Sequence, residues 1–473
     1  NLLLVVAADI PGFYAGFALM TFSAYGLVIH GETEDARRGA TAYIIMAVIG
    51  EGLIIGGLLW GAGITETMML SELQQGLAAS PRALSVSTIL WLGFAVKAGV
   101  AGLHMWLPMA HPVAPAPASA ILSGAMIKAG LWGWFFTLPI GMAPLPSLGY
   151  VVVAAGMAGV FGAAFYGVFH RDPKVVLAYS SISQMGMMTS LFGLALAKPA
   201  LWSVTGPVLV LFALHHGLNK GALFLSTGIR SRRIGIPGIL FWIAAALPAI
   251  SLAGAAGSGL AAKWAVKLSL DESNQSVMAL ILAMGAVGSV FLMVRFLLLQ
   301  YRARKGAHVR EASKMPFSMI ISWFACVIAA IALPWWLYMP ESLSSVPPVG
   351  ELPGLLWPVA VGAGISALGL WVIRFVPAAG KLARRTGRLP AGDLWPAYAF
   401  IIKANRRYFE GFATAFIRAV HQTEKQAEKW AHCFRNINDH LGRMEPIFQV
   451  WAGALMAIVA MAMAMAFSFF FHA

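Results

Sequence analysis

LWLGFAVKAGVAGLHMWLP, residues 90–108, contains the clearest indication of the fold class. It is an apolar run without the alternation of a half-buried strand, and it carries one lysine, Lys97. About 20 consecutive apolar residues cross the hydrocarbon core of a bilayer as a helix. A helix also pairs its own backbone polar groups, which lipid cannot do. The stretch therefore predicts a membrane-embedded helix that holds a buried ammonium group.

The composition of the whole chain agrees with this prediction. Of its 473 residues, 59% are hydrophobic and 11% are charged, whereas a soluble domain has about 25% charged residues. A chain of this size has no core large enough to hide so much apolar surface from water. Because the long apolar runs do not alternate, they exclude a β-barrel. We predict an all-α integral membrane protein.

The apolar runs predict about twelve or thirteen transmembrane helices. They also begin at the first residue, so we expect the sequence to start inside a longer protein. The expected spans are 1–30 (two pieces around Asp9-Ile10-Pro11), 40–62, 84–104, 116–138, 147–169, 175–197, 203–228, 236–262, 275–300, 316–338, 354–376 and 447–471.

The net charge of +14 comes from basic residues in short loops and in one late segment, 379–445, which holds twelve Lys and Arg mixed with aromatics. This distribution is typical of membrane topology and not of nucleic-acid binding. The segment suits an amphipathic helix at the membrane interface or along a neighbouring subunit, on the cytoplasmic side. A plain cytoplasmic linker is the alternative.

Little in the sequence predicts a cofactor. The two cysteines, Cys326 and Cys433, lie far apart and form neither a disulfide framework nor a thiolate metal site. There is no nucleotide-binding glycine fingerprint and no paired-histidine pattern for haem. We therefore predict no cofactor, no metal and no electron transfer by this chain.

Several ionisable residues fall inside the expected spans. They are Lys97, Lys128, Lys220, Lys263 and Glu51, with His215 and His216 one turn before Lys220. Charged groups at this depth are costly and by default indicate a functional site. Burial and a nearby carboxylate act in opposite directions on a lysine, so a lysine between them can take up and release protons. A row of such groups predicts a proton pathway. The alternative is that salt bridges only orient the helices.

Glycines flank two of these lysines. Residues 99–102 follow Lys97, and residues 254–259 precede Lys263. Glycine permits unwound backbone, and unwound backbone at membrane depth lies in protein or lines a wet cavity. The two lysines are about 165 residues apart, which indicates weak internal symmetry of the kind that inverted repeats produce.

Four motifs resemble one family. HMWLPMAHPVAPAPASAILSGAMIKAGLWGW (104–134) resembles the central motif of the antiporter-like subunits of respiratory complex I, group 4 membrane-bound hydrogenases and Mrp-type antiporters, and looks closest to the hydrogenase type. The other three motifs are RDPKVVLAYSSISQMGMM (171–188), HHGLNKGALFLSTG (215–228) and LAAKW (260–264). The resemblance covers most of residues 1–300, without the first two or three helices of the family.

The resemblance implies two inverted five-helix repeats, each with a half-channel and a broken helix. Residues 1–138 would hold the end of the N-terminal region and the first repeat, and residues 147–300 would hold the second repeat. Additional transmembrane helices would follow in 301–378, then the basic amphipathic segment 379–445 and a final transmembrane helix in 446–473.

The resemblance also implies roles for single residues. Lys97 matches the pumping lysine of the first repeat, Lys128 the connecting lysine and Lys220 the central lysine of the second repeat. Lys263 matches the exit lysine, and His216 matches the histidine of the H-x-x-x-K motif. We add His215 and His104 to the pathway as weaker candidates. Lys174 matches a loop lysine at a membrane edge, which we expect to be structural.

One departure from the family pattern concerns the first repeat. The family usually has Trp-Glu-Leu-Met where this chain has Phe17-Ala18-Leu19-Met20. The missing glutamate would pair with the pumping lysine. Glu51 is the nearby intramembrane acid, and we expect it within about 4–6 Å of Lys97 or one water away. The alternative is that Glu51 only packs locally. The prolines usual at both helix breaks are Gly or Ala here.

These observations predict a proton-translocating subunit of a multi-subunit energy-coupling complex in a bacterial or archaeal plasma membrane. Its partners would be other membrane and peripheral subunits, one of which could be a redox enzyme. Three alternatives remain open. The first is a proton-driven inorganic-carbon uptake complex, in which a zinc protein binds at 379–445. The second is a sodium/proton antiporter module, and the third is a scaffold with an inactive channel.

Overall fold

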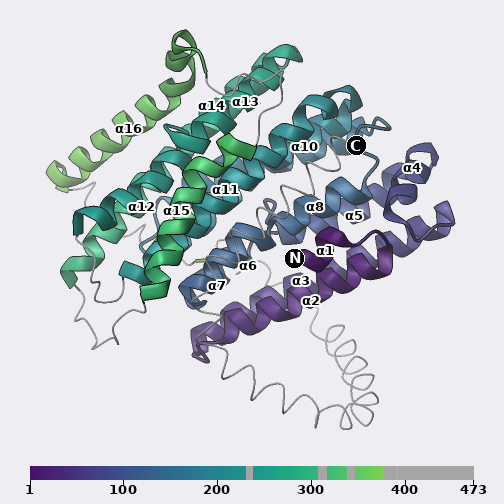
Figure 1. Ribbon diagram of the computed structural model, residues 1–473, viewed down its shortest axis with the longest axis horizontal. Coiled ribbons are helices and arrows are strands. Elements are labelled where there is room, and N and C mark those ends of the chain that lie inside the picture. Colours follow the sequence, from purple (N-terminus) through teal and green to yellow (C-terminus); the bar gives the residue numbers. More distant parts are fainter. Residues whose placement is uncertain (231–237, 307–316, 338–346, 378–390, 393–473) are drawn as a thin grey trace.

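The computed structural model describes residues 1–230, 238–306, 317–337, 347–377 and 391–392. These residues form helices and connecting turns, without a strand; one isolated bridge joins Asp9 to Met69. The prediction of an all-α fold is confirmed (Figure 1). The expected basic segment 379–445 and the final helix 447–471 lie outside the described residues, apart from 391–392.

The helices follow one another along the chain with short connections. They are α1 (Leu2–Val6), α2 (Ile10–Ile29), α3 (Glu34–Thr65), α4 (Leu70–Ala79), α5 (Ala83–Ala98), α6 (Trp106–Val113), α7 (Ala116–Ile121), the π-helix η1 (Leu122–Met126), α8 (Lys128–Thr137), α9 (Pro146–Gly167), α10 (Pro173–Ala197), the short η2 (Pro199–Leu201), α11 (Trp202–Arg230), α12 (Gly238–Leu252), α13 (Gly257–Glu272), α14 (Ser276–Gly306), α15 (Phe317–Leu337), η3 (Val349–Glu351) and α16 (Leu352–Phe375).

Eight helical spans in the described part of the chain are long and apolar enough to cross a membrane, and two shorter apolar helices join them. The chain is therefore a multi-pass membrane protein. The sequence predicts more spans than this, about twelve or thirteen. One reason for the difference is that the expected span 447–471 lies outside the described residues. In addition, the expected span 116–138 consists of three pieces, α7, η1 and α8.

Both predicted helix breaks are present. The expected span 84–104 ends early, at Ala98, and the chain resumes a helical path in α6. The expected span 236–262 is interrupted after Leu252 and continues further than predicted, to Glu272. Gly99 and Gly254 stand at the two breaks with φ of 72° and 78°, a left-handed conformation that glycine adopts without steric cost.

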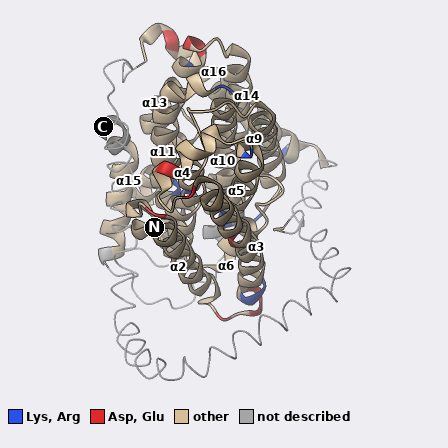
Figure 2. Cartoon of the chain, turned by 90° about the vertical axis from the view of Figure 1, so that its right-hand side faces the viewer, with Lys and Arg blue, Asp and Glu red and all other residues tan. Residues whose placement is uncertain are grey.

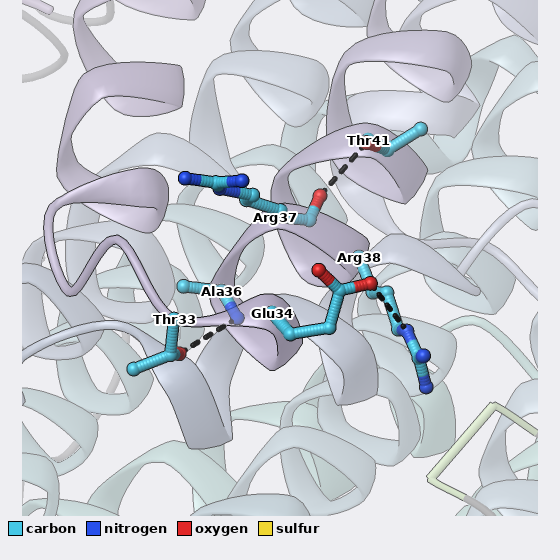
Figure 3. Close-up of polar contacts among 6 residues, drawn as sticks. All are labelled: Thr33, Glu34, Ala36, Arg37, Arg38 and Thr41. Atoms are coloured by element: carbon cyan, nitrogen blue, oxygen red, sulfur yellow. Dashed lines mark hydrogen bonds and ion pairs between the residues drawn. The ribbon is translucent and has the colours of Figure 1, made fainter.

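The start of α3 shows how local chemistry sets a boundary in this fold (Figure 3). The Thr33 side chain accepts a hydrogen bond from the Ala36 amide at 3.1 Å, so it caps the helix. Glu34 lies in the first turn, where a carboxylate is favoured, and its Oε1 is 3.3 Å from Nε of Arg38. This charged first turn lies before the apolar part of α3.

Helix α10 is the centre of the bundle, with every residue from Val175 to Ala197 buried. It packs on α9 through paired glycines. A Cβ on Gly149 would lie 2.6 Å from the Ala197 amide nitrogen, and one on Gly156 would lie 2.6 Å from the Gly186 carbonyl oxygen. Small residues at such contacts let helix backbones approach closely in lipid.

The two ends of the bundle differ in charge. One end is tied together by Lys174 Nζ, which donates to the Ala114 carbonyl at 2.6 Å, and by Arg230 Nε, which donates to the Gln300 carbonyl at 3.2 Å. Lys and Arg predominate there, and we call it the basic end: Arg37, Arg38, Arg171, Lys174, Arg230, Arg302 and Arg374.

The opposite end is where α8 meets α4 and α13 meets η3. Gln74 Nε2 donates to the Leu138 carbonyl at 2.7 Å, and Lys267 Nζ lies 3.0 Å from Glu351. Asp and Glu predominate there, and we call it the acidic end: Asp9, Glu66, Glu72, Asp271, Glu272 and Glu351. Figure 2 shows the acidic residues beside α13 and α16.

Candidate functional site

Four lysines lie between the two ends of the bundle, each at or near a helix irregularity or a histidine pair. The Lys97 and Lys128 side chains are 3% exposed and Lys220 is 0% exposed, whereas Lys263 is partly exposed. Lys97 is in the last turn of α5, and Lys128 follows the π-helix η1. Lys97, Lys128 and Lys220 are therefore buried, as the sequence predicts, whereas Lys263 is not fully buried.

Lys97 is held by hydroxyl groups and aromatic rings. Its Nζ donates to Thr21 Oγ1 at 2.6 Å and to the Tyr43 hydroxyl at 3.3 Å. Nζ also lies 5.2 Å from the centroid of the Phe17 ring and 5.3 Å from that of Tyr43. The face of an aromatic ring attracts a cation. This pocket can therefore hold the ammonium form of Lys97 without a direct counter-ion.

Glu51 approaches the same hydroxyl from α3. Its side chain is 6% exposed, lies near the Thr21 side chain and interacts electrostatically with Lys97. No ion pair within 4.0 Å joins these two described residues. The Oε1 atom of Glu51 has no hydrogen-bond partner. The acid is thus linked to Lys97 through Thr21, a hydroxyl that can donate one proton and accept another.

Lys128 joins the two halves of the bundle. Its Nζ donates to the Ser123 carbonyl at 2.6 Å and lies 2.7 Å from His216 Nδ1. Ser123 belongs to η1, and π-helical turns often mark functional sites because they disturb the regular hydrogen-bond ladder. The Ser123 hydroxyl is also 2.7 Å from that of Ser181 on α10.

Lys220 and the two histidines occupy consecutive turns of α11. Lys220 Nζ donates to the Leu177 carbonyl at 2.8 Å and interacts electrostatically with Lys128. His215 Nδ1 lies 2.8 Å from the Ser258 hydroxyl, at the start of α13. The adjacent histidines therefore point to different partners, His216 to Lys128 and His215 to the second broken helix.

Lys263 differs from the other three lysines because it lines a cavity of about 270 Å³. Its Nζ donates to the Leu355 carbonyl at 3.3 Å. The cavity wall also contains His215 and Gln184 in the interior, and Lys267 and Asp271 at the acidic end. Most of the cavity wall is apolar, but these polar side chains give water molecules hydrogen-bond partners along it. The cavity extends from the acidic end toward the centre of the bundle.

The remaining candidates lie apart from these contacts. His104 Nδ1 accepts a hydrogen bond from the Gly102 amide at 3.2 Å, and the His104 ring faces Tyr179. It therefore stabilises the loop of the first break. Lys174 binds a backbone carbonyl at the basic end, where the sequence predicts it. No group of three His, Cys, Asp or Glu side chains that could hold a metal occurs among the described residues.

Sequence reasoning missed the hydroxyl groups of the site. Thr21, Tyr43 and Ser258 contact Lys97 or His215, but hydroxyl residues also occur throughout the apolar helices. Many of them donate to the carbonyl four residues earlier, as Thr137 and Thr189 do. A single sequence gives no means of separating the two groups.

The fold and the buried lysines define an antiporter-like membrane subunit, and the comparisons with known proteins agree. Residues 7–238 match the family model described as NADH:quinone oxidoreductase/Mrp antiporter, TM. Two relatives are similar: hydrogenase-4 component B of Escherichia coli, 29% identical over 72% of this chain and 56% of its own length, and an Na(+)/H(+) antiporter subunit of Alkalihalophilus pseudofirmus, 29% identical over 59% of each chain.

A solved structure supports the same fold. The Mrp complex from a Dietzia species is similar over 86% of this chain and 50% of that chain, with a TM-score of 0.63 and 18% identity. The predicted family is thus confirmed: residues 7–238 of this chain belong to the NADH:quinone oxidoreductase/Mrp antiporter family. The chain spans about half the length of the relatives that it matches.

Proposed function

We propose that this chain is a proton-translocating subunit of a multi-subunit membrane complex. The observation that carries the proposal is the row of titratable side chains inside the bundle. Lys128, His216 and Lys220 form a buried group on α8 and α11, and His215 extends it to the second broken helix. The cavity beside Lys263 then connects His215 with the acidic end. Together these groups supply proton acceptors where lipid would supply none.

The first repeat would contribute a second proton-exchanging pair. Lys97 donates to the Thr21 hydroxyl and Glu51 lies near it, so Glu51 can take up, through that hydroxyl, the proton that Lys97 releases. In the family a glutamate at position 18 would contact the lysine directly, but this chain has Ala18 there. Proton transfer through the Thr21 hydroxyl would replace that direct contact. In this proposal Glu51 is the partner acid of Lys97.

The charge of the two ends supports an orientation. Loops rich in Lys and Arg stay on the cytoplasmic side of a membrane, so the basic end would face the cytoplasm and the cavity would open to the other side. The complex would lie in the plasma membrane of a bacterium or archaeon. The hydrogenase and antiporter relatives favour partner subunits of those kinds over a complex for inorganic-carbon uptake.

A flux measurement on the assembled complex tests the proposal. The complex is reconstituted in vesicles, and proton movement is followed with a pH-sensitive dye. Lys220→Met should lower the flux by about a hundredfold, because methionine fills the same space without a titratable group. The exposed Lys198, replaced by methionine, is the matched control. Flux that persists in the Lys220 variant would rule out proton translocation through this row.

The same preparation identifies the coupled ion. Flux that is equal in sodium-free and sodium-containing buffer supports proton translocation alone. Flux that requires sodium would contradict the proposal and favour a sodium/proton antiporter module.

A further inference from the structure

His111, on α6, is a buried histidine that the groups described so far do not include. Its side chain is 0% exposed, and its ring stacks on Phe224 of α11 with centroids 4.5 Å apart and planes 22° from parallel. Neither ring nitrogen has a hydrogen-bond partner. Buried polar groups are nearly always paired, because an unpaired one loses its hydration without replacement. The lost hydration of the two ring nitrogens therefore needs an explanation other than hydrogen bonding within the fold.

The side-chain hydrogen bond at this turn of α6 does not use the imidazole. The Ser119 hydroxyl donates to the backbone carbonyl of His111 at 3.0 Å, so the contact that fixes this turn involves no ring atom. The ring itself contributes an aromatic contact with Phe224, which a phenylalanine would also make. What histidine adds at this position is a titratable group with two exchangeable nitrogens.

Two lysines, Lys174 and Lys220, lie in the surroundings of His111. Ala114, one turn after His111, accepts the hydrogen bond from Lys174 Nζ at 2.6 Å. Phe224, on which the ring stacks, follows Lys220 by one turn of α11. Lys174 and Leu177, the carbonyl partner of Lys220, are in turn one turn apart on α10. The three helices thus bring the imidazole near both ammonium groups.

Electrostatics agree with this placement, since His111 interacts with the charges of both Lys220 and Lys174. The two lysines differ in access. Lys220 is fully buried, whereas Lys174 is only partly buried at the basic end. A proton that reaches Lys174 from solvent therefore finds a titratable side chain, His111, near both lysines.

We propose that His111 is the relay through which Lys220 exchanges protons with the basic end. One ring nitrogen accepts a proton from the side of Lys174, and the other releases a proton toward Lys220, so the imidazole returns to its neutral form after each transfer. Together with the cavity at the acidic end, this gives the row of lysines an access route on each side. The inference rests on the proposed proton translocation.

A set of variants in the reconstituted complex tests the relay. His111→Phe keeps the stacked ring and the volume but cannot carry a proton, and His111→Gln keeps hydrogen bonding but cannot titrate. Both should lower the proton flux by about tenfold or more. His111→Glu has the shape of the glutamine variant and restores a titratable group, so its flux should exceed that of the glutamine variant severalfold.

His170→Phe is the matched control, because His170 is also buried and also stacks on an aromatic ring, that of Tyr179, at 5.2 Å. Its flux should equal that of the unmodified complex. Assembly of each variant is checked by recovery of the copurifying subunits.

The outcomes separate the two proposals. Unchanged flux in His111→Phe, or equal losses in the Glu and Gln variants, overturns the relay while leaving translocation intact if Lys220→Met still abolishes flux. Flux that survives in Lys220→Met overturns both.

Discussion

The two broken helices carry the same residue type in opposite settings. In the first, Lys97 precedes the break, in the last turn of α5, and is enclosed by Thr21, Tyr43 and two aromatic rings. In the second, Lys263 follows the break, in α13, and lines a cavity that extends to the acidic end. One lysine is thus closed off and coupled to an acid, and the other is open and coupled to solvent.

The different settings of Lys97 and Lys263 indicate that a helix break can serve two purposes. The carbonyl end of α5 places partial negative charge beside Lys97, which favours its cationic form in the absence of a direct ion pair. The break before Lys263 instead removes side-chain volume, since residues 253–257 are Ala and Gly only. The first break stabilises a charge, and the second makes room for water.

The largest expected effect is that of removing the closed lysine. Lys97→Met should lower proton flux by about a hundredfold, because Glu51 and the Thr21 hydroxyl then have no lysine with which to exchange a proton. Folding should be preserved, because an apolar residue of similar volume often replaces a buried charge without loss of stability. Flux in reconstituted vesicles and the thermal transition of the complex are the two measurements. Normal flux would mean that the first break does not participate.

Accessibility gives the next largest contrast. In a background without Cys326 and Cys433, Lys263→Cys should react at least about tenfold faster than Lys97→Cys with a charged, membrane-impermeant thiol reagent, because a thiol must meet solvent to react. The reagent is added at either face of the vesicle, and labelling is followed by mass spectrometry. Equal rates would contradict the distinction between a closed and an open break.

A smaller effect tests the hydroxyl link. Thr21→Val removes the group that Lys97 and Glu51 share and should lower flux by about fivefold, as expected for the loss of one hydrogen bond worth about 1 kcal/mol. Thr21→Ser, which keeps the hydroxyl, is the control. Glu51→Gln should reduce flux similarly, and the Ala18→Glu change should restore it in that background. No recovery would mean that position 18 does not reach Lys97.

The smallest effect concerns the backbone of the breaks. Gly99→Ala and Gly254→Ala force a side chain into left-handed backbone and should each destabilise the protein by about 1–2 kcal/mol. A Cβ at Gly254 would also lie 2.5 Å from Lys263 Cε, so this variant alone should reduce flux. Gly56→Ala, a helical glycine with open space around it, is the control. Thermal unfolding in detergent measures the difference.

The parts of the fold that sequence predicts are those with strong local chemistry. Long apolar runs give the helices, and Lys97 and Lys263 beside glycines give both breaks, because charge and glycine are rare and costly inside lipid. Helix α4 was not predicted, since its short segment mixes Leu with Ser, Glu and Gln. The extent of α13 was also not predicted, because Lys263, Lys267 and Asp271 suggest a loop unless the cavity that solvates them is known.

The site was predictable in its residues but not in its contacts. The intramembrane lysines stand out in any apolar run, and Glu51 is the acid inside an expected span before Lys97. The approach of Glu51 to Thr21 depends on the crossing of α2 and α3, which no local pattern encodes. His111 escaped notice because it lies in a proline-rich stretch, AHPVAPAP, where a loop position explains a histidine equally well.

The cavity beside Lys263 has an electrical consequence. In the proposed function, water in the cavity would carry the potential of the outer solution inward, so the voltage across the membrane would fall over the thinner slab of protein between Lys263 and the basic end. Moving one elementary charge through the full voltage is worth about 2.3 kcal/mol per 100 mV. Most of that energy would then be exchanged in the few side-chain transfers within the slab, where the field is steepest.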